Sequence, residues 1–233
     1  MFKPSLEEAK KLSEGYTIIP VSRELFADIK TPIAVLQNIR SISSQYYLLE
    51  SVESGEKWGR YSFLGFNPTL ELKCKDGLLE ITGVKELKAE TSDPNSYIRD
   101  ILKEYRSPKL EFLPPFTGGF VGYFAYDYIK YAEPSLKLDG KDQTNFYDVD
   151  LMLFDKVIAF DHFRQKIILM INIKTDNLEA NYYEAVKELD NMASLIKASL
   201  PSPASTSRLM SEFKSFFSKE EYCEIVNKVK SYI

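Results

Sequence analysis

Leu70–Thr82 (LELKCKDGLLEIT) decides the fold class. Its first half alternates apolar residues at 70, 72 and 74 with charged ones, as in a strand with one buried face. Asp76-Gly77 follows, a dipeptide that favours the type I′ turn because both of its central positions need positive φ. The stretch therefore predicts a tight antiparallel hairpin.

The rest of the chain alternates helices and strands irregularly, with hairpins rather than strand-helix-strand units. This organisation predicts an α+β fold of antiparallel sheets with helices packed outside them. A second hairpin is expected from one strand over 149–160 and another over 166–173, with its turn at 161–164. Further strands are expected at 16–21 and 120–126, and helices at 6–12, 32–39, 95–105, 178–200 and 218–233.

The composition argues against nucleic-acid binding and against a membrane protein. The 233 residues are 44% hydrophobic and 27% charged, with a net charge of -4 and no basic stripe that would follow a phosphate backbone. We therefore expect no nucleic-acid binding. Cys74 and Cys223 fit no disulfide or metal spacing, the first residues form no signal peptide, and no apolar run approaches a membrane span. A cytoplasmic protein with no membrane contact is the expectation.

Residues 201–211 (PSPASTSRLMS) are rich in serine and proline, as exposed linkers are. A helix with a Ser218/Glu221 capping box follows, and an apolar stripe through Tyr222, Ile225 and Val229 lies along it. Either this helix folds back on the preceding body, or it is the first element of a region that follows. We expect a domain at 1–200, a linker at 201–217 and the start of a second domain at 218–233.

One segment has the composition of a binding site. The expected strand after Tyr47 ends at Glu50-Ser51, and a turn containing Gly55 returns the chain through Arg60. A carboxylate and a hydroxyl can bind the ammonium group of an amino acid, and an arginine can hold its carboxylate. Trp58, Tyr61 and Phe63 could line an apolar pocket beside them. Polar residues also commonly decorate strand ends, and spacing alone leaves both interpretations open.

Other candidates for chemistry are weaker. Gly118–Gly122 lacks the GxGxxG spacing of a nucleotide loop, and the only histidine, His162, is expected to be a solvated turn residue. Asp148, Asp150 and Asp155 complete no metal-ligand spacing, so a solvated strand face is expected. No nucleophile and base occur at motif spacing.

The chain resembles anthranilate synthase component I. The resemblance is carried by Leu48–Ser51, by Gly55–Ser62 (GEKWGRYS), and by Pro115–Gly119 with the Val-Gly-Tyr and Tyr-Asp pairs that follow it. It runs through the whole chain in the family's order. The Leu-Leu-Glu-Ser element distinguishes this family from its sister, aminodeoxychorismate synthase, better than any other part of the chain.

The resemblance implies a four-layer α/β/β/α architecture and a lyase that converts chorismate and ammonia to anthranilate and pyruvate. It implies Mg²⁺ as cofactor and a glutamine amidotransferase, component II, as partner. Carried over residue by residue, it implicates Glu50 and Ser51 in an allosteric site for L-tryptophan, while Arg60 is an inference from the neighbouring strand.

The motifs of the family's chorismate-binding half, with its catalytic histidine and Mg²⁺-binding glutamates, are absent from this sequence. We therefore expect the N-terminal regulatory region of such an enzyme, inactive alone and without catalytic or metal residues of its own. Two alternatives stay open: the same region of aminodeoxychorismate synthase, and a stand-alone amino-acid-binding module.

Overall fold

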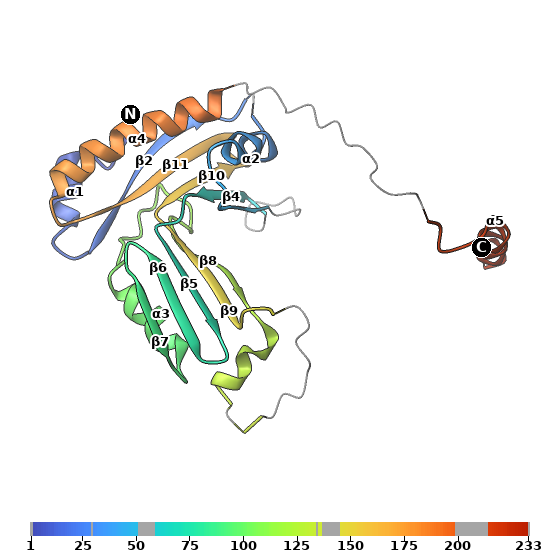
Figure 1. The fold of residues 1–233 in the computed structure, drawn as a ribbon. Helices are drawn as coiled ribbons and strands as arrows, with labels where there is room; N and C mark the ends of the chain where they lie inside the picture. The colour runs from blue at the N-terminus through green and yellow to red at the C-terminus, as the bar shows by residue number, and fades with distance from the viewer. Residues whose placement is uncertain are drawn as a thin grey trace. The chain divides into compact units, whose positions relative to one another are not determined.

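A computed structural model describes residues 2–28, 30–50, 59–133, 135–136, 145–198 and 214–232. Its strands form two sheets in which every pairing is antiparallel, and helices lie against each sheet (Figure 1). The predicted α+β class is confirmed. The six-stranded sheet has the order β1 (Phe2–Lys3), β2 (Ile18–Phe26), β11 (Lys166–Lys174), β10 (Lys156–Asp161), β4 (Tyr61–Phe66), β3 (Tyr46–Leu49).

The five-stranded sheet contains the hairpin predicted from the sequence. Leu70 pairs with Gly83 at its open end and Lys75 with Leu78 at the turn. Asp76 and Gly77 have φ of 49° and 82°, as a type I′ turn requires. The strand order is β7 (Leu87–Glu90), β6 (Leu78–Gly83), β5 (Leu70–Lys75), β9 (Val149–Phe154), β8 (Gly119–Phe124).

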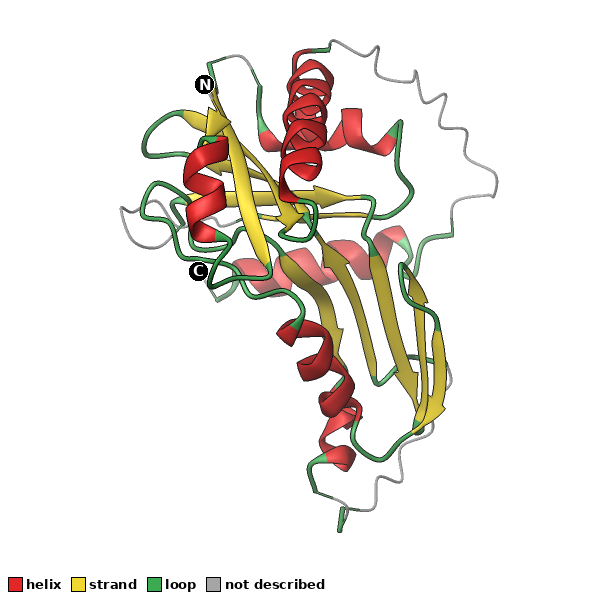
Figure 2. Ribbon diagram, turned by 90° about the vertical axis from the view of Figure 1, so that its left-hand side faces the viewer, coloured by secondary structure: helices red, strands yellow, loops and turns green. Residues whose placement is uncertain are grey.

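Three helices cover one face of the six-stranded sheet. The longest, α4 (Leu178–Lys197), lies along the sheet, and α1 (Leu6–Leu12) and α2 (Pro32–Arg40) pack beside it (Figure 2). All three begin within three residues of their predicted starts, and α1 has the predicted Ser5/Glu8 capping box. The buried residues of α4 recur every three or four positions because only one stripe of a helix faces a sheet: Tyr182, Ala185, Leu189, Met192, Ala193 and Ile196.

The predicted strand over 149–160 is wrong, because Asp155 divides it in two. β9 ends at Phe154 in the five-stranded sheet, and β10 begins at Lys156 in the six-stranded sheet. Apolar residues continue across the division, so the sequence pattern shows no interruption there. At this point a single residue, Asp155, carries the chain from one sheet to the other.

The five-stranded sheet is covered by α3 (Pro94–Lys103) and by a short 3₁₀ helix, Tyr126–Tyr131. The 3₁₀ helix also corrects the expected solvation of Asp148. This carboxylate is 6% exposed, and it accepts hydrogen bonds from Lys130 Nζ (2.8 Å), the Tyr131 hydroxyl (2.8 Å) and the Asp76 amide (2.7 Å). Asp148 thus ties the hairpin turn to the 3₁₀ helix rather than facing water.

The chain divides into two compact units, Met1–Leu200 and Pro201–Ile233. The second unit contains α5 (Lys219–Lys230), whose Ser218/Glu221 capping box is the predicted one. Tyr222, Ile225 and Val229 are exposed on this helix. Among the described residues, no helix combines the length and apolar character needed to cross a membrane.

Gly122 of β8 is expected to tolerate no side chain. A Cβ placed there would lie 2.0 Å from the Asp150 carbonyl oxygen and 2.9 Å from the Leu151 Cα, both backbone atoms of the neighbouring strand. Gly122→Ala should therefore separate β8 from β9 and cost about 1–3 kcal/mol or more. Gly15→Ala is the matched control, since a Cβ at Gly15 meets nothing within 4 Å. Urea unfolding of both variants checks the prediction, and equal stability would contradict it.

Candidate functional site

The β3–β4 hairpin places two of the predicted site residues at one end of the six-stranded sheet. Leu49, the last residue of β3, pairs with Phe63 of β4, so Glu50 follows β3 at the end where Arg60 precedes β4. Glu50 is exposed. Ser51, Gly55 and Trp58, which were also named for this segment, lie outside the described residues.

Arg60 forms a two-point ion pair with Asp161. The Nε atom of the arginine lies 3.0 Å from Oδ1 of Asp161, and Nη2 lies 2.6 Å from Oδ2. Asp161 ends β10, its side chain is 1% exposed, and its Cα is paired with that of Tyr61. The guanidinium expected to hold a ligand carboxylate thus holds a carboxylate of its own chain. Sequence spacing gave no signal for this pair, whose members are 101 positions apart.

Arg60 and two backbone N–H groups stabilise the negative charge of the buried Asp161 carboxylate. Its Oδ1 atom also accepts the backbone N–H groups of Phe163 (3.2 Å) and Arg164 (3.0 Å). Burial by itself would raise the pKa of Asp161, but the hydrogen bonds and positive charge of Arg60 and these N–H groups lower it below its ordinary value. The arginine in turn lies over the rings of Tyr61 (4.8 Å) and Phe163 (5.5 Å). These contacts hold Arg60, the residue immediately before β4, in one position.

Ser62 and His162 form a second polar pair beside the first. The Ser62 hydroxyl is fully buried and lies 2.7 Å from Nε2 of His162, whose imidazole is stacked on Phe160. His162 is exposed, as expected of a turn residue. Its serine partner lies 100 positions away in the chain and was not predicted. Within the described ranges no carboxylate binds its Nδ1 atom, so the pair lacks the third member of a nucleophile–base set.

Aromatic side chains border the same end of the sheet, on the face turned away from α4. The rings of Tyr61 and Phe63 lie 5.8 Å apart, and Phe116 meets Phe63 edge to face at 5.6 Å. Tyr61 and Phe63 share this face because they are two positions apart on one strand. The predicted aromatic lining is thus partly assembled, from β4 and from the segment that precedes β8.

The Mg²⁺ ion that the resemblance implies finds no donor set in the described part of the chain. No group of three or more His, Cys, Asp or Glu side chains is arranged there to hold a metal ion.

A family model described as chorismate binding enzyme matches residues 45–233. The chain belongs to this family. Among curated relatives, the anthranilate synthase component 1 of Aquifex aeolicus (strain VF5) is 36% identical to this protein over 98% of the chain. That of Acetivibrio thermocellus is 36% identical over 100% of it. The resemblance predicted from the sequence is confirmed.

The matched segment covers 47% and 49% of those two relatives, so the chain spans about half the length of the curated relatives it matches. The solved anthranilate synthase component I of Streptococcus pneumoniae TIGR4 superposes with a TM-score of 0.46 and 23% identity, over 90% of this chain and 45% of that one.

Proposed function

We propose that this chain is the N-terminal region of an anthranilate synthase component I, and that Glu50 and Ser51 form part of a feedback site for L-tryptophan. The observation that carries the proposal is the 36% identity, over almost the whole chain, to relatives named anthranilate synthase component 1. The complete enzyme would be a cytoplasmic lyase that makes anthranilate and pyruvate from chorismate. Its ammonia would come from glutamine through an amidotransferase, component II, and it would use Mg²⁺.

The geometry supports different roles for Glu50 and Arg60 in the proposed tryptophan site. Glu50 is exposed at the end of β3 and offers a carboxylate for the ligand's ammonium group. Arg60 already bonds both oxygens of Asp161, and a guanidinium has five N–H donors in all. Arg60 therefore acts first as a positioning residue that fixes the start of β4, and any contact with the ligand carboxylate is shared with Asp161.

Two measurements test the proposal. The protein encoded by the complete reading frame, given chorismate, ammonia and Mg²⁺, should release fluorescent anthranilate, and L-tryptophan should inhibit it. A non-fluorescent amino derivative of chorismate would instead identify an aminodeoxychorismate synthase. Tryptophan binding by a complete protein that leaves chorismate unchanged would identify a stand-alone regulatory module.

The 233-residue chain by itself should leave chorismate unchanged under the same conditions. Anthranilate formation by the purified chain would overturn the assignment to a regulatory region. Isothermal titration with L-tryptophan, and with D-tryptophan as the matched control, then measures whether this chain holds enough of the site to bind its ligand alone.

A further inference from the structure

His162 bonds to two residues at the start of β4, at the end of the sheet where Glu50 follows β3. Its Nε2 atom lies 2.7 Å from the hydroxyl oxygen of Ser62, and its backbone N–H donates to the carbonyl oxygen of Arg60 at 2.9 Å. Its imidazole ring is stacked on Phe160, the residue of β10 that pairs with Ser62. His162 therefore holds the start of β4 against the end of β10 with both its main chain and its side chain.

The Ser62 hydroxyl depends on His162 for its hydrogen bond. Ser62 is fully buried, and within the described ranges its hydroxyl bonds to this imidazole alone. A buried hydroxyl that loses its partner is costly. Loss of the imidazole therefore favours any shift of β4 that brings the Ser62 hydroxyl to water.

The strand register places Ser62 beside Glu50. Leu49 pairs with Phe63, so continuing the same register sets Glu50 opposite Ser62. Residues directly opposite each other in an antiparallel pair project to the same face, with their Cβ atoms about 5 Å apart. Because Glu50 is exposed and Ser62 is buried, a shift of Ser62 would move the surface from which the Glu50 carboxylate projects.

We propose that His162 is a positioning residue of the tryptophan site at Glu50 and Ser51, and that it acts through Ser62. This inference rests on the feedback site proposed above. His162 itself does not touch the ligand. Its imidazole holds Ser62 in place, and the neighbouring Glu50 carboxylate then lies where it can accept the ligand's ammonium group.

The test measures, in the complete enzyme, the L-tryptophan concentration that halves the rate of anthranilate formation. His162→Leu should raise this concentration about fivefold or more, because the Ser62 hydroxyl loses its partner. His162→Gln should return it to within about twofold of the wild type, since the glutamine amide can bond the same hydroxyl. Rescue by glutamine separates the hydrogen bond from the mere presence of a side chain.

Ser62→Ala tests the same bond from the other side with a smaller change. It should raise the half-inhibiting tryptophan concentration about threefold or more. In the Ser62→Ala background, His162→Leu should add less than about twofold, because the hydroxyl through which the imidazole acts is already absent.

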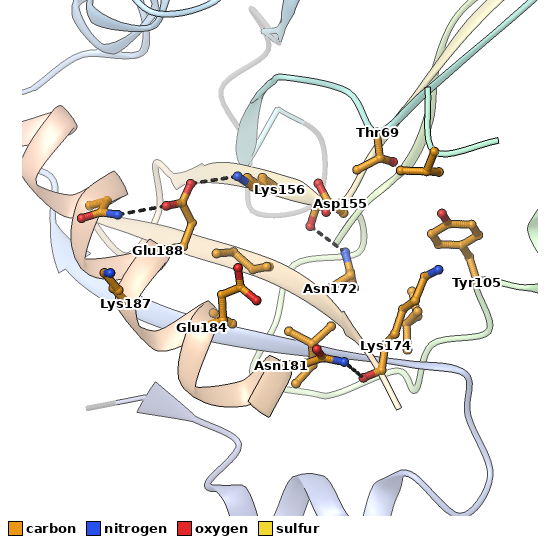
Figure 3. Close-up of a pocket in the computed structure, with 16 residues that line it drawn as sticks. Thr69, Tyr105, Asp155, Lys156, Asn172, Lys174, Asn181, Glu184, Lys187 and Glu188 are labelled. Atoms are coloured by element: carbon orange, nitrogen blue, oxygen red, sulfur yellow. Dashed lines mark hydrogen bonds and ion pairs between the residues drawn. The ribbon is translucent and has the colours of Figure 1, made fainter. Parts of the chain in front are cut away.

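The other end of β10 supplies a matched control. There Lys156, the first residue of the strand, binds Glu188 of α4 at 2.8 Å beside a cavity of about 570 Å³ (Figure 3). At roughly 3.3 Å per residue, the strand puts this ion pair about 20 Å from His162. Glu188→Gln loosens β10 at that end and should leave the half-inhibiting tryptophan concentration within about twofold of the wild type.

The outcomes separate this inference from the proposed function. If L-tryptophan does not inhibit the wild-type enzyme, both are overturned. If it does, the role of His162 alone is overturned by unchanged inhibition of a folded His162→Leu or Ser62→Ala variant. A failure of His162→Gln to restore inhibition, or an equal effect of Glu188→Gln, would overturn it as well.

Discussion

Replacing Arg60 by alanine is expected to lower the free energy of unfolding by about 3 kcal/mol, because it leaves a buried carboxylate without its counter-charge. Asp161 is 1% exposed at its side chain and cannot turn to water without breaking the end of β10. The amides of Phe163 and Arg164 remain as donors, which puts the expected loss at the lower end of the range for broken buried pairs. For a domain of this size, the midpoint of thermal unfolding should fall by roughly 6–12 °C.

The matched control is Lys88→Ala, which removes an ion pair with Glu80 whose side chains are 79% and 45% exposed. Such pairs contribute little, so this variant should stay within about 0.5 kcal/mol of the wild type. Asp161→Asn and the double variant complete a mutant cycle that isolates the energy of the pair. A loss in Arg60→Ala no larger than that in Lys88→Ala would contradict the role given to the pair.

The same pair predicts the response to acid. The pKa of Asp161 is lower in the folded protein than in the unfolded chain, where the pKa of an aspartate is about 3.9. Its contribution to stability is therefore complete above that pH and is lost as pH falls through the folded value. The wild type should lose its advantage over Asp161→Asn only below about pH 4.

Replacing Ser51 by leucine in the complete enzyme should raise the L-tryptophan concentration needed for half inhibition by about tenfold or more. The reason is that a polar partner of the ligand is lost and an apolar group takes its place. Glu50→Gln should act in the same direction, since the ligand's ammonium would lose a charged acceptor. Anthranilate formation without tryptophan should be unchanged in both variants, because both act at the feedback site.

Glu90→Gln provides the control for the tryptophan series. It makes the same chemical change as Glu50→Gln, but in β7 of the five-stranded sheet. Curves of inhibition by L-tryptophan for the three variants, measured at one chorismate concentration, test whether Glu50 and Ser51 belong to the feedback site. If Ser51→Leu and Glu50→Gln are inhibited like Glu90→Gln, the feedback site lies elsewhere.

Local signals in the sequence predicted local structure well. The Ser5/Glu8 and Ser218/Glu221 capping boxes and the turn at Asp76-Gly77 each depend on residues within four positions, and each is present as predicted. The division at Asp155 was missed because alternation along a strand does not reveal which sheet the strand joins. Asp155 itself was expected on a solvated face, whereas its Oδ1 atom is shielded from water.

The candidate site shows the same limit. Spacing placed Glu50 and Arg60 at one end of a strand pair, which the antiparallel pairing of β3 with β4 reproduces. It could not supply Asp161 or His162, which reach this place from about 100 positions away. The tryptophan assignment came from the family resemblance and remains a proposal.

The position of β2 in its sheet has a consequence for synthesis on the ribosome. Phe26 of β2 pairs with Lys166 of β11, 140 positions later in the chain (166 − 26). At roughly 5–20 residues per second, the apolar start of β2 waits about 7–30 s before its main partner strand has been made. During that interval Ile18, Ile19 and Val21 have no partner strand in β11 to pair with. A nascent chain interrupted before β11 therefore exposes an apolar, aggregation-prone segment that chaperones would have to shield.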